Sequence, residues 1–272
     1  MILVHKEWDR ICSSVNAKKC FTISELPNLS KDTDWLAIKH DVETNVERAL
    51  QIALIEAKHG IRATFFIQSY LLNGNEKCLK KISELGHEVT YHYDVLDSNY
   101  GDIELATKEF SKTIDKFELL GFPVTSVCPH GNPMMNRVGW SSNRDFFRDT
   151  TVAMKFADIF DLVVQGKQKI ARNYAYISDA GYGFNIISDI DGNDRANSRD
   201  IPLSSIEELI ERTASSSALV ISTHPHRWSQ NVISAWFAKL RFFTIRKLAI
   251  TASRFRVLKR IMSKFYFLAK KI

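Results

Sequence analysis

Short apolar runs alternate with amphipathic segments through the first half of the chain. Runs at 35–40, 63–67, 88–92 and 124–128 are typical of buried strands. Between them, apolar residues recur three and four positions apart over 44–59, 76–85 and 103–120, and a glycine follows each segment. This alternation of strand and helix predicts an α/β fold with a parallel sheet, open or closed into a barrel.

The pattern is weaker beyond Pro129. Strands are predicted at 162–164, 174–178 and 218–223, and a polar loop at 188–200. A helix is predicted at 204–214, because Ser204 followed by Glu207 matches a capping box. One more helix is expected at 3–17.

Polar side chains that can carry chemistry follow several of the predicted strands. They are Asp41, Glu43, His92, His130, Asp179, His224 and His226. The carboxyl ends of parallel strands meet on one rim, so these residues are expected to converge on one site. Strand alternation places His40 on the face opposite Asp41, with Glu43 back on the face of Asp41. A structural alternative for Asp41 is that it caps the helix beginning near Thr44.

Imidazole and carboxylate groups together suit Zn²⁺ or a similar divalent ion. Three protein ligands and one open position are typical of hydrolytic metal sites. Such an ion lowers the pKa of bound water from about 15.7 to about 7 and polarises a substrate carbonyl. A neighbouring carboxylate can then accept a proton, and a histidine across the site can return one to the leaving group. The sequence therefore predicts a metal-dependent hydrolytic site.

Charge is distributed unevenly along the chain. The formal net charge is +6, yet the last 34 residues hold 11 Lys and Arg and no acidic residue, which leaves −5 for residues 1–238. A nucleic-acid partner is therefore not expected for the main body. Four cysteines without CxxC spacing, no apolar span of about 18 residues and no signal-like start predict a cytoplasmic protein, with peripheral attachment to the inner membrane left open.

Four segments resemble successive motifs of the polysaccharide deacetylase superfamily (NodB-like, carbohydrate esterase family 4). They are 38–43 (IKHDVE), 63–66 (ATFF), 86–92 (GHEVTYH) and 222–225 (STHP). The resemblance covers roughly residues 35–228 and is closest to the branch with an HDVD-type first motif, often associated with surface-polysaccharide biosynthesis. It implies a distorted (β/α) barrel of about seven strands that removes acetyl groups from N-acetylated sugars with a metal-activated water.

The resemblance also assigns roles by position. Asp41 resembles the base, His92 the first metal-binding histidine, His224 the acid that protonates the amine, and Asp179 the group that orients His224. Three family positions differ in this chain. Val42 stands at the second aspartate, Leu96 at the second histidine, and Cys128 at the arginine that normally precedes the Pro-aromatic-Gly motif, which reads PHG here.

These departures shift the expected ligand set of the metal. The ligands are drawn from Asp41, Glu43, His92 and His130, with zinc as the expected ion. His40, His87 and His226 are weaker candidates, with structural roles expected for them.

The C-terminal tail, 232–272, differs in character from the barrel domain predicted at 1–231. In its last part, apolar residues recur at helical spacing, with basic residues mostly on the other side: Phe255, Leu258, Ile261, Met262, Phe265 and Leu268. A basic amphipathic helix of this kind suits an anionic membrane surface. The alternative is a helix that covers the outside of the barrel.

The sequence as a whole predicts a deacetylase-like hydrolase that acts on the amide of an N-acylated sugar in cell-surface polysaccharide biosynthesis. Two alternatives stay open. One is an acyl-transfer or other C–N bond enzyme on the same scaffold. The other is a catalytically inactive member that binds glycan or acts as a membrane scaffold.

Overall fold

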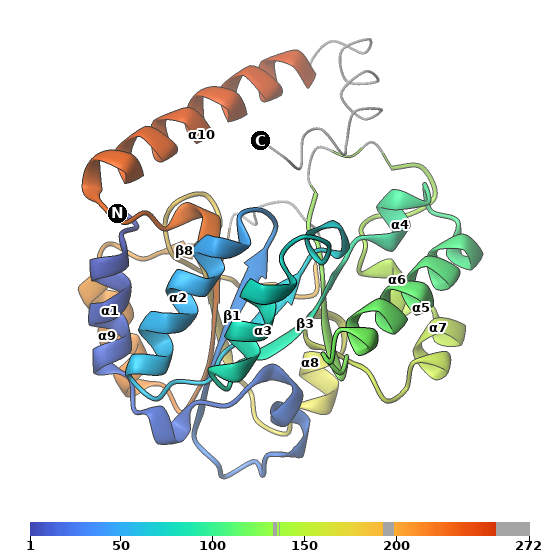
Figure 1. The fold of residues 1–272 in the computed structure, drawn as a ribbon, viewed down its shortest axis with the longest axis horizontal. Helices are drawn as coiled ribbons and strands as arrows, with labels where there is room; N and C mark the ends of the chain where they lie inside the picture. Colours follow the sequence, from blue (N-terminus) through green and yellow to red (C-terminus); the bar gives the residue numbers. More distant parts are fainter. Residues whose placement is uncertain (133–134, 136, 193–198, 254–272) are drawn as a thin grey trace.

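The computed structural model describes residues 1–132, 135, 137–192 and 199–253 (Figure 1). One sheet organises these residues, in the order β5-β4-β3-β2-β1-β9-β6-β7-β8. The first seven strands in this order run parallel. They are β5 (Phe160–Asp161), β4 (Ser126–Pro129), β3 (Glu88–Tyr93), β2 (Thr64–Ile67), β1 (Trp35–Val42), β9 (Ala218–Thr223) and β6 (Ala175–Ser178).

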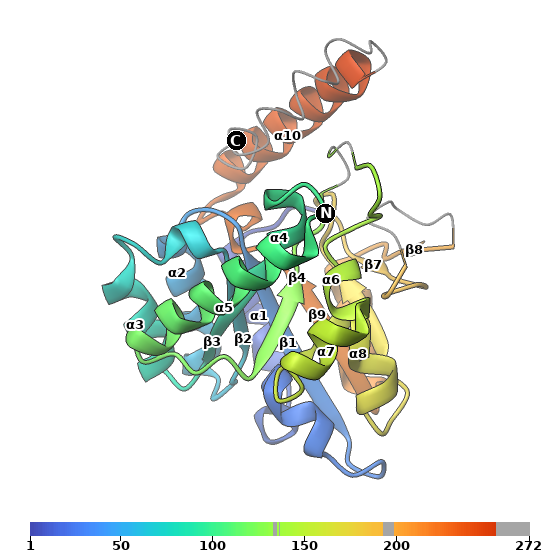
Figure 2. The same cartoon turned by 90° about the vertical axis from the view of Figure 1, so that its right-hand side faces the viewer.

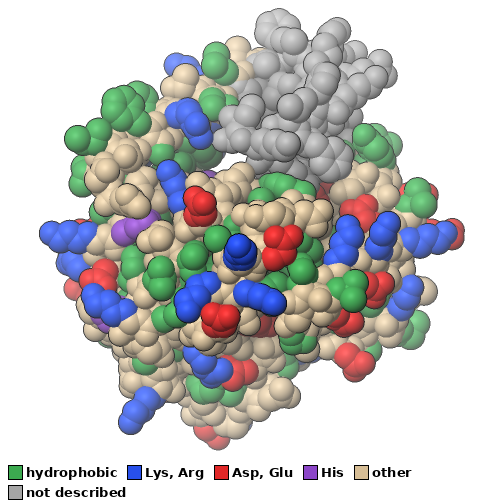
Figure 3. Space-filling view, viewed as in Figure 1, with side chains coloured by type: hydrophobic (Ala, Val, Ile, Leu, Met, Phe, Trp, Pro, Cys, Tyr) green, Lys and Arg blue, Asp and Glu red, His purple; other side chains and the backbone are tan. Residues whose placement is uncertain are grey.

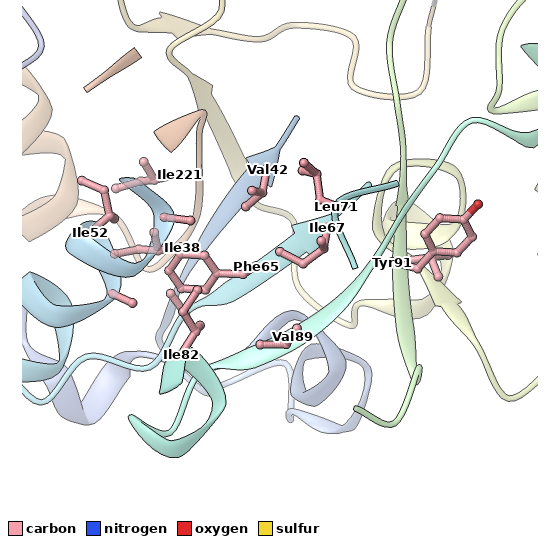
Figure 4. Close-up of a cluster of buried hydrophobic side chains, with 14 of the residues drawn as sticks. Ile38, Val42, Ile52, Phe65, Ile67, Leu71, Ile82, Val89, Tyr91 and Ile221 are labelled. Carbon is pink, nitrogen blue, oxygen red and sulfur yellow. The ribbon is translucent and has the colours of Figure 1, made fainter. Parts of the chain in front are cut away.

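Helices cover the outer face of this sheet (Figures 1 and 2). The main ones are α1 (His5–Ser14), α2 (Val46–Lys58), α3 (Glu76–Glu84), α5 (Ile103–Leu119) and α9 (Ile206–Ser215). Shorter helices are α4 (Val95–Ser98), α6 (Asp145–Arg148), α7 (Thr150–Lys155) and α8 (Leu162–Lys169). Alternate residues of the strands face these helices and form the main core, in which Ile38, Phe65 and Ile221 lie close to Ile52 of α2 and Ile82 of α3 (Figure 4).

A second apolar cluster lies on the inner face of the sheet. Trp35 and Ala37 of β1 belong to the same cluster as Phe160 of β5 and Tyr176 of β6. The two end strands of the parallel run thus share one core, which the α8 residues and the 3₁₀ segment Ile23–Asn28 complete. The predicted distorted barrel of about seven parallel strands is confirmed.

Two predicted elements are corrected. Residues 162–164 begin helix α8, because Oδ1 of Asp161 accepts hydrogen bonds from the amides of Val163 and Val164 and so caps a helix there. The cap of the helix predicted at 204–214 lies one residue later than expected. Ser205, not Ser204, is the N-cap of α9, and its hydroxyl oxygen accepts from the amide of Glu208.

Beyond β6, the chain adds two short antiparallel strands that the sequence analysis missed. They are β7 (Asn185–Ile186) and β8 (Ile201–Pro202), at two residues each too short to show alternation.

Helix α10 (Val232–Ser253) follows the 3₁₀ turn η4 (Pro225–Arg227) and begins where the predicted tail begins. It is apolar on two sides. Ala238 and Phe242 pack against the main core, and the ring of Phe242 contacts Tyr182 with centroids 4.9 Å apart. On the other side, Trp236 is 59% exposed and Phe237 69%.

The amphipathic stretch predicted from Phe255 to Leu268 lies outside the described residues. In the part of the chain that is described, no helix combines the length and the hydropathy needed to cross a bilayer.

Candidate active site

Strand β1 separates two sets of polar groups, as its alternation predicts. Lys39 and Asp41 face the inside of the barrel, where Lys39 Nζ contacts Cys128 of β4. His40 faces the helices, stacked on Phe65 and bonded to Glu56 of α2. Asp41 does not cap α2, because Asn45 accepts from the first-turn amide of that helix.

Side chains from four strand ends meet around the carboxylate of Glu43. Its Oε1 lies 3.3 Å from His130 Nε2, 3.9 Å from His224 Nε2 and 4.0 Å from His92 Nε2. Asp41 Oδ2 lies 3.9 Å from the same nitrogen of His224. The structure therefore brings these five predicted residues together at the end of the barrel toward which the parallel strands point.

The geometry of His92 leaves one ring nitrogen with a free lone pair. Its Nδ1 lies 2.9 Å from the carbonyl oxygen of Cys128, so Nδ1 must be the protonated nitrogen. Its Nε2 is buried and has no hydrogen-bond partner. Burial lowers the pKa of His92 to about 4, although Asp41 acts in the opposite direction. The ring is therefore neutral. A neutral imidazole with an unpartnered nitrogen is the form that binds a metal ion.

Two groups of side chains in this region could hold a cation. Glu43, His92 and His130 form one, and Asp41, His92 and Cys128 form the other. In each group the ligand atoms lie within 4.8 Å of one another. Two imidazoles and a carboxylate make a donor set that suits Zn²⁺ with an open coordination position. The residues present therefore fit the expected ion.

The loop that carries His130 is fixed by a buried polar cluster. Asn143 donates through Nδ2 to the carbonyl of His130 and to Asp97, with distances of 2.9 and 3.0 Å. Asp97 also accepts two hydrogen bonds from the guanidinium of Arg137. The sequence analysis missed this support, because Asp97 and Asn143 follow no strand and are 46 residues apart.

Asp179 holds His224 in one orientation. Its Oδ1 accepts from His224 Nδ1 at 2.6 Å, and its Oδ2 accepts from the backbone amide of His224 at 3.0 Å and from Trp228 Nε1 at 3.2 Å. Burial alone would raise the pKa of Asp179, but His224 and then Arg227 lower it below its usual range. With Nδ1 engaged, His224 turns Nε2 toward Asp41 and Glu43.

Lys39 is a further residue near the site that the sequence analysis left out. It is 1% exposed, and its Nζ lies 2.6 and 2.8 Å from the two carboxylate oxygens of Asp41 and 3.1 Å from Cys128 Sγ. Burial raises the pKa of Asp41, but Lys39, followed by His92 and His224, lowers it to about 2. Its position two residues before Asp41 was the available signal, because both then point to the same face of the strand.

The weaker histidine candidates lie apart from the cation groups. His40 and His87 are buried between the sheet and α2, where His87 Nε2 donates to the carbonyl of Ala53. His226 is closer, with its ring centroid 5.8 Å from that of His224, and burial lowers its pKa to about 3.

The two carboxylates of the cation groups, Asp41 and Glu43, have different surroundings. Asp41 is bound by Lys39, whereas Glu43 is 25% exposed at its side chain and faces the three histidines. Burial raises the pKa of Glu43, and His130 with the neighbouring histidines lowers it well below its usual range. Both carboxylates are therefore ionised, with different partners.

Comparison with known proteins gives matches among solved structures. The first is a carbohydrate esterase family 4 pseudoenzyme from Bacillus anthracis, 13% identical, with a TM-score of 0.44, covering 80% of this chain and 63% of that chain. The chain therefore spans less than two thirds of that protein. The resemblance of the sequence motifs to the polysaccharide deacetylase superfamily stays a prediction.

Two further matches cover most of their own chains. A family 4 carbohydrate esterase from Streptomyces lividans, solved with acetate, is 14% identical with a TM-score of 0.41, covering 78% of this chain and 89% of that one. The catalytic domain of a peptidoglycan N-acetylglucosamine deacetylase from Eubacterium rectale is 13% identical with a TM-score of 0.42, covering 81% and 90%. No family model matches the sequence. No curated protein matches it either.

Proposed function

We propose that this protein removes the acyl group from an N-acylated sugar in a reaction that depends on a divalent cation. The observation that carries the proposal is the convergence of three histidine Nε2 atoms on the carboxylate of Glu43, with ionised Asp41 beside them. A neutral ligand histidine, two carboxylates and an oriented histidine are the parts that hydrolysis of an amide needs.

Glu43, His92 and His130 would hold the cation. When bound, the ion supplies a Lewis acid that lowers the pKa of water and polarises the acyl oxygen. Asp41 accepts the proton of the attacking water, since Lys39 keeps this carboxylate ionised at neutral pH. His224 delivers a proton through Nε2 to the departing sugar nitrogen, and Asp179 stabilises the charged imidazole that this role requires.

The proposed substrate is an N-acylated sugar or glycan intermediate of cell-surface polysaccharide biosynthesis. Support comes from the motif resemblance and from the names of two similar structures, one a peptidoglycan N-acetylglucosamine deacetylase and one a carbohydrate esterase with acetate. The test is acetate release from a panel of N-acetylated sugars and oligosaccharides by the zinc-loaded protein. We expect release by the wild type and its loss in Asp41→Asn and His224→Ala.

A matched control comes from α2. His59 is partly exposed and binds Asp9 on the surface, away from the candidate site. His59→Ala should therefore retain wild-type acetate release. Full activity in Asp41→Asn or in His224→Ala, with the fold intact, would contradict the role given to that residue. Transfer of the acyl group to an acceptor in place of release would instead favour the acyl-transfer alternative, and mass spectrometry of the products distinguishes the two.

One observation favours a second candidate function, a catalytically inactive protein that binds glycan. Val42 and Leu96, which stand at two ligand positions of the family, are both buried in the main apolar core. They cannot contribute to a metal site. Purified protein that contains no divalent metal and takes up none on titration would support this second function against the first.

We also propose that the protein is cytoplasmic and binds an anionic membrane surface through α10. The exposed side of the helix carries a row of large apolar residues, visible on its outer surface in Figure 3. They are Ile233, Trp236, Phe237, Leu240 and Leu248. Lys247 lies on the same helix side, and no acidic residue occurs from Lys239 onward, which suits anionic lipid.

Sedimentation with lipid vesicles tests this surface. We expect the full chain to bind vesicles of phosphatidylcholine with phosphatidylglycerol, and Trp236→Ser with Phe237→Ser to abolish binding. Leu105→Ser with Leu119→Ser, on the exposed side of α5, is the matched control and should bind as the wild type does. Equal binding by the α10 variant, or dimerisation through α10 without lipid binding, would contradict the proposal.

A further inference from the structure

The two cation groups at the end of the barrel share His92, so one ion cannot use both complete sets of ligands. We call Glu43, His92 and His130 the upper group, and Asp41, His92 and Cys128 the lower group. The upper group offers nitrogen and oxygen ligands alone. The lower group would bring a cysteine sulfur to the ion, which favours softer metals and changes the chemistry of the site.

The ammonium group of Lys39 already occupies the lower group. Its Nζ contacts both oxygens of Asp41 and the sulfur of Cys128. An ammonium has three N–H donors, and these three contacts account for all of them. The ring of Phe66 lies on another side of the ammonium, with its centroid 5.2 Å away.

Burial makes this arrangement hard to displace. Lys39 is among the largest fully buried side chains among the residues described, and its charge is compensated only by the carboxylate above it. Moving the ammonium aside for a metal ion would leave a buried charge without a partner, which is a costly state. A divalent ion beside the ammonium would meet a like charge within a few ångströms, which is also unfavourable.

We infer that the ammonium of Lys39 acts as a fixed internal cation between Asp41 and Cys128 and restricts the divalent ion to Glu43, His92 and His130. Lys39 is thus a positioning residue. It keeps both oxygens of Asp41 away from the metal, so this carboxylate serves as the base, and it keeps the thiol of Cys128 out of the coordination shell. The inference rests on the proposed metal centre and specifies its ligands.

Cobalt is the probe for this inference, because a thiolate bound to Co²⁺ gives a charge-transfer band in the near ultraviolet and nitrogen and oxygen ligands do not. Spectra are recorded on the full chain as wild type, Cys128→Ser, Lys39→Met and the double variant Lys39→Met with Cys128→Ser. The wild type should bind Co²⁺ without the band, and Cys128→Ser should leave spectrum and affinity unchanged. Lys39→Met should gain the band, and the double variant should lose it.

Lys58→Met, on the exposed surface of α2, is the control for loss of a lysine and should give the wild-type spectrum. If Lys39→Met does not fold, the comparison of wild type with Cys128→Ser still decides. A wild-type band that Cys128→Ser abolishes would overturn the inference while leaving a metal centre in place. A folded Lys39→Met that binds Co²⁺ without the band would also overturn it. A wild type that binds no Co²⁺ would refute the proposed metal centre itself.

Discussion

Two buried histidine–carboxylate pairs of this protein differ in what the second ring nitrogen of the histidine faces. His224 Nδ1 is 2.6 Å from Asp179, and His40 Nε2 is 2.7 Å from Glu56. The remaining nitrogen of His40 is 2.6 Å from the hydroxyl of Thr223, and the residue is completely buried. The remaining nitrogen of His224 faces Asp41 and Glu43 at the rim, and the residue is 9% exposed.

The pairs come from different elements. His40 lies on β1 and meets Glu56 of α2 on the helix side of the sheet, whereas His224 follows β9 and meets Asp179, which follows β6, at the rim. Their chemistry is alike, but only the rim pair has a nitrogen available to a substrate. A histidine beside a carboxylate indicates a reactive site only when its second nitrogen is left open.

The largest expected effect is on the rim pair. His224→Ala removes the proposed acid and should lower kcat for acetate release by about 10²–10⁴, the usual contribution of general acid–base catalysis. The free energy of unfolding should also fall, by about 1–3 kcal/mol, because the buried carboxylate of Asp179 loses its hydrogen bond from His224 Nδ1. Steady-state kinetics and denaturant unfolding on the same preparation check both. A kcat of His224→Ala within a few-fold of the wild-type value would mean that the rim pair, like the buried pair, has no catalytic role.

The second largest effect is expected at the buried pair of His40 and Glu56, and it should be a loss of stability. Glu56→Ala leaves the indole N–H of Trp8 and the ring of His40 without their shared acceptor. At about 1–3 kcal/mol for each unsatisfied buried donor, the free energy of unfolding should fall by about 3 kcal/mol. Urea unfolding measures it. Glu84→Ala, at the exposed end of α3, is the control and should lie within about 0.5 kcal/mol of the wild type. An equally small change for Glu56→Ala would mean that the buried network is not structural.

A third buried carboxyl sharpens the comparison because no histidine pairs with it. Burial raises the pKa of Asp161 to about 6, although Tyr93 and the amides of α8 bind it. Between about pH 4 and pH 6, Asp161 keeps its proton in the folded protein and loses it in the unfolded chain. Its contribution to stability is therefore fully present below about pH 4 and is lost as pH rises through about 6. Asp179, whose pKa is lowered, contributes in the opposite direction and loses its contribution as pH falls.

Unfolding of Asp161→Asn followed against pH tests that sign. We expect the stability difference between variant and wild type to shift in favour of the variant by about 2 kcal/mol between pH 4 and pH 6, at about 1.4 kcal/mol for each unit of pKa shift. A constant difference across this range would show that Asp161 has an ordinary pKa in the folded protein.

The smallest effect is expected at Thr223. Replacing it with Val keeps the shape of the side chain and removes the hydroxyl that meets His40, at a cost of about 1 kcal/mol in the free energy of unfolding. Acetate release should not change in Thr223→Val. A fall in kcat without a loss of stability would indicate that the buried pair acts on the rim through Thr223, which would break the comparison.

Strand-end residues were the part of the site that the sequence could predict. Period-two alternation on β1 and the parallel order of the strands are enough to bring Asp41, Glu43, His92, His130 and His224 to one rim. Six of the seven parallel strands followed from the pattern of apolar runs and helices, whereas β5 was missed and the count of about seven came from the family resemblance. The residues 162–164 were misassigned because a short apolar run fits a strand or a buried helix equally, and the capping contacts of Asp161 decide between them.

Long-range partners could not be predicted. Lys39 reaches Cys128 from 89 residues away, and Glu56 reaches His40 across the space between a helix and a strand. Pairings of this kind depend on the register and curvature of the sheet, which no local pattern in the sequence encodes. The boundary between the domain at 1–231 and the tail at 232–272 stays a prediction.

X-ray absorption at the zinc K-edge of the zinc-loaded protein tests the central claim most directly, namely that Glu43, His92 and His130 hold one divalent ion at the rim. The account predicts one tightly bound zinc whose first shell contains nitrogen and oxygen only, with the scattering of two imidazoles, reduced to one in His130→Ala. A shell that contains sulfur, or a protein that retains no zinc, would contradict it.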